Sequence, residues 1–493
     1  MHRHWLLALV AACGGSYGSG MHGHYKAVAS VAAEPTVNGN TSTDYGINPW
    51  VDTATDPLST FAADVDTASY TLARKALEGG HLPPPESVRV EEWVNYFHYA
   101  FPPATPGAPF SVVIDAAPSP LHPEHHVLRV GVATPPKPDS ERKPANLVFL
   151  VDVSGSMSED DKLPLAKQAL KLLVEQLRPT DTIALVTYAG RTRVVLHATP
   201  VGAKSKILDA IDDLSSSGST AMGAGLDLAY EEAMKGVHDG AIARVIVCTD
   251  GDANVGTRSA KGMLGIIEER AQAGVTLSTI GFGMGNYRDD LMEQLADKGN
   301  GNNYYLDSWR AAQKLFTSEL VGMLEVAAKD TKLQLEFDPQ LVARYRLVGY
   351  ENRAIKDEDF RKDKVDAGEI GVGHQVTALY EVELTERGKA APGPLATLRI
   401  RHKAPDGDVA TEHTYAMAGA PAATFDAAPL DLRFAFAVAA FADVLRGADS
   451  ASLDDIGAIA RGAAGRDTDR NELLQLIAKA RSLRGSAAAT VAR

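Results

Sequence analysis

Between residues 146 and 327, long apolar runs alternate with amphipathic segments, and this alternation restricts the possible folds more than any other feature. The runs NLVFLVDV, DTIALVTYAG, RVIVCTDG and VTLSTIGFG are rich in Val, Ile and Leu, as strands buried on both faces are. Intervening segments such as LPLAKQALKLLVEQL have the apolar spacing of helices. The pattern predicts an α/β domain over 146–327, with a doubly wound, mostly parallel sheet between helices.

The segments on either side of this domain have a different pattern. At 109–145 and 328–425, apolar and polar residues alternate, as they do in half-buried strands. We therefore expect the α/β domain to be inserted in, or flanked by, a β-sandwich-like domain. Residues 61–108 predict an N-terminal helical cap, and residues 426–493 predict two or three C-terminal helices.

The N-terminus begins MHRHWLLALVAAC, with a short basic head, an apolar stretch and small residues before Cys13. This resembles the bacterial lipobox, in which a signal (here 1–12) is cut before a cysteine that becomes lipidated. An ordinary secretory signal or a chance cysteine is the alternative. Residues 13–60 are rich in Gly, Ser, Thr and Asn, which predicts a flexible tether. No other apolar run reaches the ~18 residues that span a bilayer, so we expect an anchored or secreted protein, not a transmembrane one. The lipobox resemblance favours a lipid-anchored bacterial cell-envelope protein, on the periplasmic or outer-membrane side.

The charge and the cysteines exclude two classes of protein. The net charge is −14 and no long basic run occurs, which argues against a nucleic-acid partner and leaves cation binding open. Cys248 lies in the apolar run RVIVCTD, where a buried thiol is expected. With no other cysteine in the predicted core, a disulfide framework is excluded.

Polar residues follow the predicted parallel strands at the edge where such sheets bind ligands. The candidates are Asp152, Ser154, Ser156, Thr220 and Asp250. All supply hard oxygen atoms, a donor set that suits Mg²⁺, Mn²⁺ or Ca²⁺ rather than zinc or copper. We expect a divalent cation here, Mg²⁺ first among the three.

The spacing of the first three candidates has a physical reason. Gly155 relaxes the backbone, so that the hydroxyls of Ser154 and Ser156 can converge beside Asp152. Because the whole set holds only two carboxylates, a bound divalent cation would remain under-neutralised. It would then accept an outside carboxylate at an open position.

The same residues, in the same order, resemble the metal-ion-dependent adhesion site of the von Willebrand factor type A (VWA) domain. The resemblance covers about 146–327 and implies that the serines and the threonine bind metal directly or through water, with the aspartates often acting through water. The family's frequent Gly-Gly-Thr is Gly218-Ser219-Thr220 here. In addition, DVDTASYTLARKAL, VRVEEWVNYF, CTDGDANVG and GFGMGNYRDDLMEQLADKGNGNNYYLD resemble bacterial YfbK-like lipoproteins over most of the chain.

Other interpretations of this cluster are weaker. Ser156 could merely cap a helix, but Thr220 and Asp250 at the expected places favour a metal site. A nucleophilic serine needs a base, and His197 belongs to a predicted edge strand. The G-x-S-x-G match at 14–18 lies in the tether.

Two further motifs are interpreted structurally. Asp64-Val-Asp66-Thr67 has Ala68 rather than the hydroxyl residue that a phosphatase DxDxT motif requires, so a helix N-cap is favoured. The glycines of GFGMG at 281–285 break the dinucleotide spacing, which indicates a loop bordering the metal face.

The sequence thus predicts a non-enzymatic, membrane-anchored binding protein. Its cation would complete its coordination with an exposed acidic residue of a partner protein. A structural or envelope-assembly lipoprotein whose metal site binds no ligand is the alternative, and a metal-dependent hydrolase is a third class.

Overall fold

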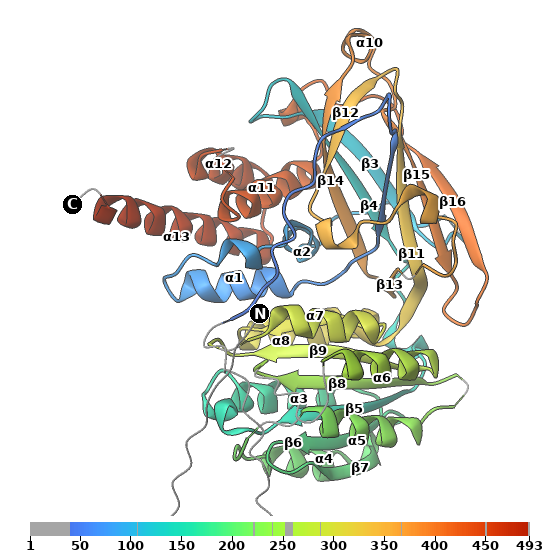
Figure 1. The fold of residues 1–493 in the computed structure, drawn as a ribbon, viewed down its shortest axis with the longest axis vertical. Coiled ribbons are helices and arrows are strands. Elements are labelled where there is room, and N and C mark those ends of the chain that lie inside the picture. The colour runs from blue at the N-terminus through green and yellow to red at the C-terminus, as the bar shows by residue number, and fades with distance from the viewer. Residues whose placement is uncertain are drawn as a thin grey trace, which may run out of the picture. The chain divides into compact units, whose positions relative to one another are not determined.

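The computed structural model describes the chain from residue 40 onward, with short gaps (Figure 1). The described ranges are 40–105, 107–219, 222–238, 240–251, 260–285, 287–365, 367–448 and 451–491. The predicted signal peptide and Cys13 lie outside these residues, as does the tether up to residue 39. None of the helices within the described part is both long enough and apolar enough to cross a membrane.

A six-stranded sheet forms the centre of the α/β domain. Its spatial order is β10-β9-β8-β5-β6-β7, and every neighbouring pair is parallel except the antiparallel pair of β6 and β7. The strands are β5 (Ala145–Asp152), β6 (Thr182–Tyr188), β7 (Arg193–Pro200), β8 (Ile242–Thr249), β9 (Val275–Phe282) and β10 (Asn303–Leu306). The doubly wound, mostly parallel sheet predicted from the apolar runs is confirmed.

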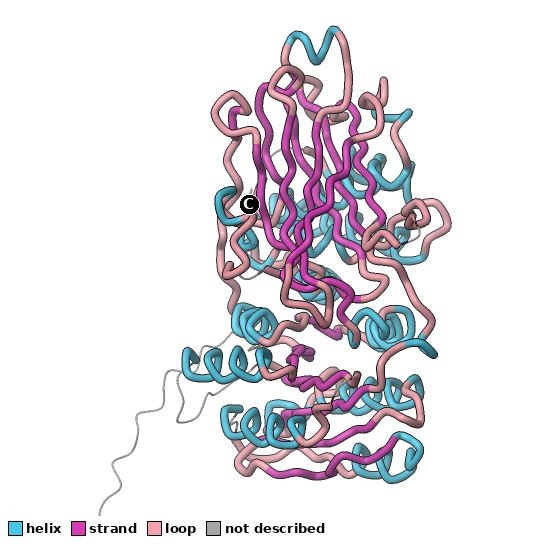
Figure 2. Tube along the Cα trace, turned by 90° about the vertical axis from the view of Figure 1, so that its right-hand side faces the viewer, coloured by secondary structure: helices cyan, strands magenta, loops and turns pink. Residues whose placement is uncertain are grey.

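Helices pack on both faces of this sheet, as Figure 2 shows. Along β5, Leu147 and Phe149 face one apolar cluster, whereas Val148 and Leu150 face the other, because successive strand side chains alternate. The first face is covered by α3 (Leu163–Gln176), α4 (Lys204–Asp212), α8 (Trp309–Gln313) and α9 (Leu320–Leu324). The second is covered by α5 (Met222–Met234), α6 (Ala260–Gln272) and α7 (Asp289–Lys298).

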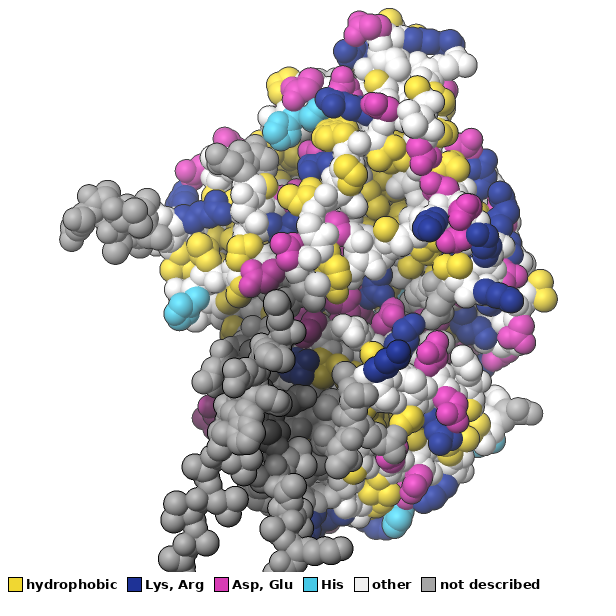
Figure 3. Space-filling view, viewed as in Figure 1, with side chains coloured by type: hydrophobic (Ala, Val, Ile, Leu, Met, Phe, Trp, Pro, Cys, Tyr) yellow, Lys and Arg dark blue, Asp and Glu magenta, His cyan; other side chains and the backbone are white. Residues whose placement is uncertain are grey.

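Two antiparallel sheets form a β-sandwich from segments before and after the α/β domain. One sheet has the order β1-β12-β14-β4-β3, and the other has the order β13-β11-β15-β16 with β2 paired to β11. The strands are β1 (Val51–Asp52), β2 (Leu58–Ala62), β3 (Ser111–Pro118), β4 (His125–Ala133), β11 (Val326–Phe337), β12 (Val342–Val348), β13 (Gly368–Gly371), β14 (Gln375–Leu384), β15 (Ala396–Lys403) and β16 (Ala410–Ala416). Since β4 pairs with β14, the α/β domain is inserted in the sandwich. On the face drawn in Figure 3, basic and acidic side chains are interspersed over the described surface.

The N-terminal helices pack on the C-terminal ones. Trp93 of α2 (Val90–Asn95) meets Phe441 edge to face, with ring centroids 5.4 Å apart. Arg74 of α1 (Ala68–Glu78) pairs with Asp307 at 2.6 Å and with Glu472 at 2.9 Å, which joins α1 to the end of β10 and to a C-terminal helix. The C-terminal helices are α11 (Leu430–Leu445), α12 (Leu453–Ala464) and α13 (Thr468–Val491).

The predicted tether boundary at residue 60 is wrong. β1 pairs with β12, and β2 pairs with β11 from Leu58 to Ala62. Phe61 of β2 is buried in the sandwich core. These strands are short, and they are held by hydrogen bonds between their backbone N–H and C=O groups and those of neighbouring strands. Such bonds do not depend on which side chains the strand carries. The Gly- and Thr-rich composition therefore did not mark where these strands begin.

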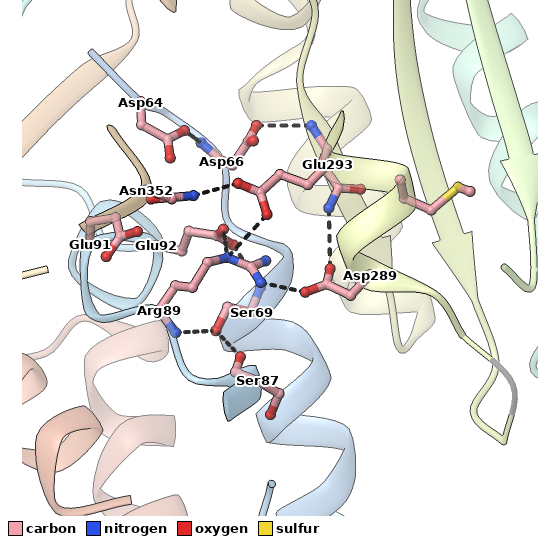
Figure 4. Close-up of polar contacts among 12 residues, drawn as sticks. Asp64, Asp66, Ser69, Ser87, Arg89, Glu91, Glu92, Asp289, Glu293 and Asn352 are labelled. Carbon is pink, nitrogen blue, oxygen red and sulfur yellow. Dashed lines mark hydrogen bonds and ion pairs between the residues drawn. The ribbon is translucent and has the colours of Figure 1, made fainter. Parts of the chain in front are cut away.

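A buried network of charged side chains joins the α/β domain to the surrounding segments (Figure 4). Arg89 at the start of α2 donates hydrogen bonds to Glu92 of that helix and to Asp289 of α7. Arg353, from the sandwich, lies 3.5 Å from Glu293 of α7. The network therefore connects elements that are about 200 residues apart in sequence.

The helix N-cap predicted at Asp64-Val-Asp66-Thr67 is confirmed in position. Thr67 occupies the N-cap position of α1, but its side chain accepts no hydrogen bond there. Asp66 accepts a hydrogen bond from the backbone N–H of Asn303 at 2.8 Å, and Asp64 pairs with Arg353 at 3.1 Å. Both aspartates belong to the buried network.

Carboxyl groups outnumber cations in this network. Six buried carboxyl side chains contribute, namely Asp64, Asp66, Glu91, Glu92, Asp289 and Glu293. Within the described residues, Arg89 and Arg353 pair with five of them, whereas Glu91 accepts a hydrogen bond from the backbone N–H of Tyr350. Burial raises the pKa of Glu91 to about 7 and that of Glu92 to about 8. The network therefore retains protons near neutral pH.

We expect the free energy of unfolding to fall by about 1 kcal/mol per pH unit as the pH rises from about 6.5 to about 8.5. In that window Glu91 and Glu92 hold protons that the unfolded chain has released, so raising the pH favours unfolding. Burial lowers the pKa of His374 to about 4, which acts in the opposite sense, but only below the pKa of about 6.5 in the unfolded state.

Urea denaturation followed over this pH range measures the slope. The Glu92→Gln variant, which cannot release a proton at this position, should show a shallower decline than the parent chain. A stability that stays constant or rises over the range would contradict the protonated network.

Candidate functional site

The predicted oxygen cluster lies where β5 and β8 end. These strands are parallel neighbours, with Val151 opposite Cys248, and β6 lies on the other side of β5. The chain thus leaves β5 at a topological switch point, the place where open α/β sheets form their crevice. Asp152, the last residue of β5, and Asp250, directly after β8, both emerge at this point.

The turn after β5 holds its polar groups close together. Asp152 Oδ1 accepts a hydrogen bond from the backbone N–H of Ser154 at 2.8 Å. Ser154 Oγ lies 2.9 Å from Ser156 Oγ. Asp152 and Ser154 are buried, whereas Ser156 is partly exposed. Three oxygen-bearing side chains are therefore presented from five consecutive residues.

The second oxygen of Asp152 is also fixed. Its Oδ2 accepts a hydrogen bond from Thr249 Oγ1 at 3.2 Å, and Thr249 Oγ1 accepts one from the backbone N–H of Gly251 at 3.0 Å. Gly251 has a φ of +77°, and a Cβ there would lie 2.8 Å from the Cα of Tyr287. Glycine is therefore required in the turn that positions Asp250.

Lys162 contacts Asp250 directly. Its Nζ lies 3.2 Å from Asp250 Oδ2 and donates a hydrogen bond to the backbone oxygen of Ser156 at 3.0 Å. Both Lys162 and Asp250 are less than 10% exposed. The lysine thus bridges the two chain segments that carry the candidate residues.

The loop that precedes Thr220 is hydrogen-bonded to the turn after β5. The backbone N–H of Gly155 donates to the oxygen of Gly218 at 3.0 Å, and that of Ser217 donates to the oxygen of Val153 at 2.7 Å. Thr220 itself lies outside the described residues. The structure therefore brings together Asp152, Ser154, Ser156 and Asp250, and Thr220 remains a prediction.

The donor chemistry of these residues fits a hard divalent cation. Carboxylates and hydroxyls dominate the site, and these are the ligands that Mg²⁺, Mn²⁺ and Ca²⁺ prefer. Among the described residues, at this site or elsewhere, no three His, Cys, Asp or Glu side chains are arranged to hold a metal. Burial raises the pKa of Asp152 to about 6, and the negative charge of Asp250 acts in the same direction. A bound cation would favour the ionised carboxylates over this repulsion.

His197, the histidine considered as a base for the serines, makes its contacts elsewhere. Nδ1 of His197 lies 3.2 Å from Glu232, and the histidine is on the edge strand β7. The thiol of Cys248 is buried in the core, where burial raises its pKa to about 12. Neither group hydrogen-bonds to Ser154 or Ser156.

Sequence reasoning missed two residues of the site. Thr249 was visible in the CTD stretch beside Asp250, but a threonine at the end of a buried strand gives no distinct signal. Lys162 follows the acidic stretch at 159–161, where a solvated lysine is the ordinary expectation. The predicted GFGMG loop does border the site, because Gly283 packs on the Lys162 side chain.

Family models match three parts of the chain. Residues 36–129 match "von Willebrand factor", residues 146–318 match the "von Willebrand factor type A domain", and residues 322–483 match "Uncharacterized protein YfbK, C-terminal". The middle match contains all the described residues of the site.

Among curated proteins, the chain is similar to "Uncharacterized protein YfbK" of Escherichia coli (strain K12). The two are 41% identical over 458 residues, covering 87% of this chain and 79% of that protein. This chain is also 29% identical over 213 residues to "Uncharacterized protein sll0103" of a Synechocystis strain, covering 43% of this chain and 50% of that protein.

Solved structures provide more distant matches. A von Willebrand factor type A protein from Catenulispora acidiphila is 17% identical, covering 74% of this chain and 86% of that chain, with a TM-score of 0.43. Proximal thread matrix protein 1 from the mussel byssus, solved with a zinc-occupied metal-ion-dependent adhesion site, is 24% identical, covering 36% of this chain and 45% of that chain, with a TM-score of 0.30.

Proposed function

Because the chain belongs to the YfbK family and contains a VWA domain, we propose that it is a binding protein that engages its partner through a divalent cation. The cation would be held by Asp152, Ser154, Ser156, Thr220 and Asp250. An exposed acidic residue of a partner protein would complete the coordination. When bound, the cation supplies a positive centre that binds the carboxylate, and no bond of the partner is broken.

One observation carries this proposal: the convergence of the oxygen donors at the β5–β8 switch point. Asp152 is held by Ser154 and Thr249, so its carboxylate needs little reorganisation to bind a cation. The hydroxyls of Ser154 and Ser156 are neutral donors, and Lys162 offsets one of the two carboxylates, so a divalent cation would keep part of its positive charge. That residual charge favours an anionic ligand from outside.

We further propose that the protein acts at the bacterial cell envelope, anchored by lipid on Cys13. The lipobox-like VAAC at residues 10–13 supports this location. Mg²⁺ is the proposed cation, because an all-oxygen site with few carboxylates suits it, and Mn²⁺ or Ca²⁺ are the alternatives. The proposed role is non-catalytic, because His197, the histidine considered as a base for the serines, lies on the edge strand β7 beside Glu232.

Affinity capture from envelope extract tests the proposed function. The immobilised full chain, loaded in Mg²⁺, should retain a protein that EDTA releases, and a matched column carrying Asp250→Ala should retain none of it. Retention of the same protein by both columns, unchanged by EDTA, would rule out cation-mediated binding. If the parent chain binds Mg²⁺ but EDTA releases nothing, the structural, non-ligand-binding role is favoured instead.

A further inference from the structure

We infer that Lys162 is a built-in counter-charge that makes the cation site selective for anionic ligands. The inference rests on the proposed function and assigns a role to a residue outside the predicted donor set. Lys162 Nζ lies 3.2 Å from Asp250 Oδ2 and 3.0 Å from the Ser156 oxygen. It therefore lies against two of the segments that would surround the cation.

The position of Lys162 is enforced by the packing of its side chain. It precedes α3 and is 7% exposed. A Cβ on Gly283 would lie 2.5 Å from Lys162 Cγ and Cε, so the aliphatic part of the lysine lies directly on this glycine. Gly283 has a φ of +65°, which glycine adopts without strain. Its backbone oxygen accepts a hydrogen bond from the Tyr305 hydroxyl at 2.6 Å.

The loop that contains Gly283 is also held from outside the α/β domain. Asn40 Oδ1 accepts hydrogen bonds from the backbone N–H groups of Gly285 and Tyr287 at 3.0 and 3.1 Å. The N–H of Thr41 donates to the oxygen of Tyr287 at 2.9 Å. Since the surface that packs on Lys162 is fixed on several sides, the ammonium group cannot easily move away from Asp250.

The charge at the site explains what this lysine would do. Asp152 and Asp250 are the buried carboxylates of the set, and Lys162 cancels one of them. Its other acidic neighbour, Glu159 at 3.6 Å, has a side chain that is 66% exposed, so water screens that pair. A divalent cation would then leave a net positive site. Without the lysine the two carboxylates would cancel its charge, so the under-neutralised cation expected from the sequence depends on Lys162. Lys162 should therefore weaken cation binding and strengthen the binding of an anion to the loaded site.

The Lys162→Met substitution tests this inference, because methionine keeps the apolar length and removes the charge. Binding of Mn²⁺ to the full chain, followed by water-proton relaxation, should become about tenfold tighter. Binding of acetate, used as a minimal carboxylate, to the Mn²⁺-loaded variant should become about tenfold weaker. These two effects have opposite signs, which a general loosening of the fold would not produce.

Lys167→Met is the matched control, because Lys167 of α3 donates to the backbone oxygens of Asp212 and Leu214, not to Asp250. It should change neither affinity. Thermal melting of each variant without metal checks that the fold is retained. Affinities for Mn²⁺ and acetate that are unchanged, or that shift in the same direction, in Lys162→Met would overturn the inference. A parent chain that binds no Mn²⁺ would instead overturn the proposed function.

Discussion

Replacing Asp152 by alanine should lower the affinity of the chain for Mg²⁺ by about 100-fold or more, while the fold is retained. The variant loses a buried carboxylate that hydrogen bonds from Ser154 and Thr249 hold in place. Folding should tolerate the change, because burial already disfavours the ionised form of Asp152 and raises its pKa to about 6. Titration calorimetry with Mg²⁺, alongside a urea denaturation curve, measures both quantities.

Asp160→Ala is the control for this experiment. Asp160 is an exposed carboxylate in the segment that follows the same turn, so its loss should leave the affinity for Mg²⁺ nearly unchanged. If Asp152→Ala bound Mg²⁺ as tightly as the parent chain, Asp152 could not be a ligand. Comparable losses in both variants would point to a diffuse electrostatic effect instead.

Replacing Arg89 by methionine should lower the free energy of unfolding by about 3–5 kcal/mol at neutral pH. Arg89 is buried and pairs with Glu92 and Asp289, while Glu293 lies 3.9 Å away. Its removal leaves buried carboxyl groups without their cation, so they must either take up protons or remain charged in an apolar setting. Urea denaturation measures the loss.

The control for Arg89→Met is a substitution that removes the arginine of an exposed ion pair. Arg361, whose side chain is 63% exposed, pairs with Glu412, and Arg361→Met should cost less than about 1 kcal/mol. The loss of unfolding free energy in Arg89→Met should also be smaller at lower pH, because the carboxyl groups left without a cation are then protonated. An effect of Arg89→Met as small as that of Arg361→Met would show that the network does not join the domains energetically.

The α/β sheet could be predicted because its signal is local. Each apolar run, such as 147–151, is long enough to mark a buried strand, and the polar residue that ends it marks the carboxyl edge. Once β5 and β8 are taken as neighbours, Asp152 and Asp250 must emerge together. The oxygen-rich site follows from strand ends and donor chemistry, without knowledge of side-chain packing.

The remaining features depend on contacts between distant segments. Asp64 and Arg353 pair across 289 residues, and Arg89 and Asp289 pair across 200, so no local pattern marks either pair. Lys162 could not be recognised because its role depends on Gly283, which packs on it from a loop far along the sequence. Early strands such as β2 are stabilised by pairing with β11 and are not marked by their own composition.

The most direct test of the central claim is a crystal of the full chain soaked with Mn²⁺ and acetate. We expect an anomalous scattering peak at the end of β5, bound by Asp152, Ser154 and Ser156, with an acetate oxygen also bound to the metal. The absence of a peak there, in crystals that show Mn²⁺ at other positions, would contradict a cation-mediated binding site.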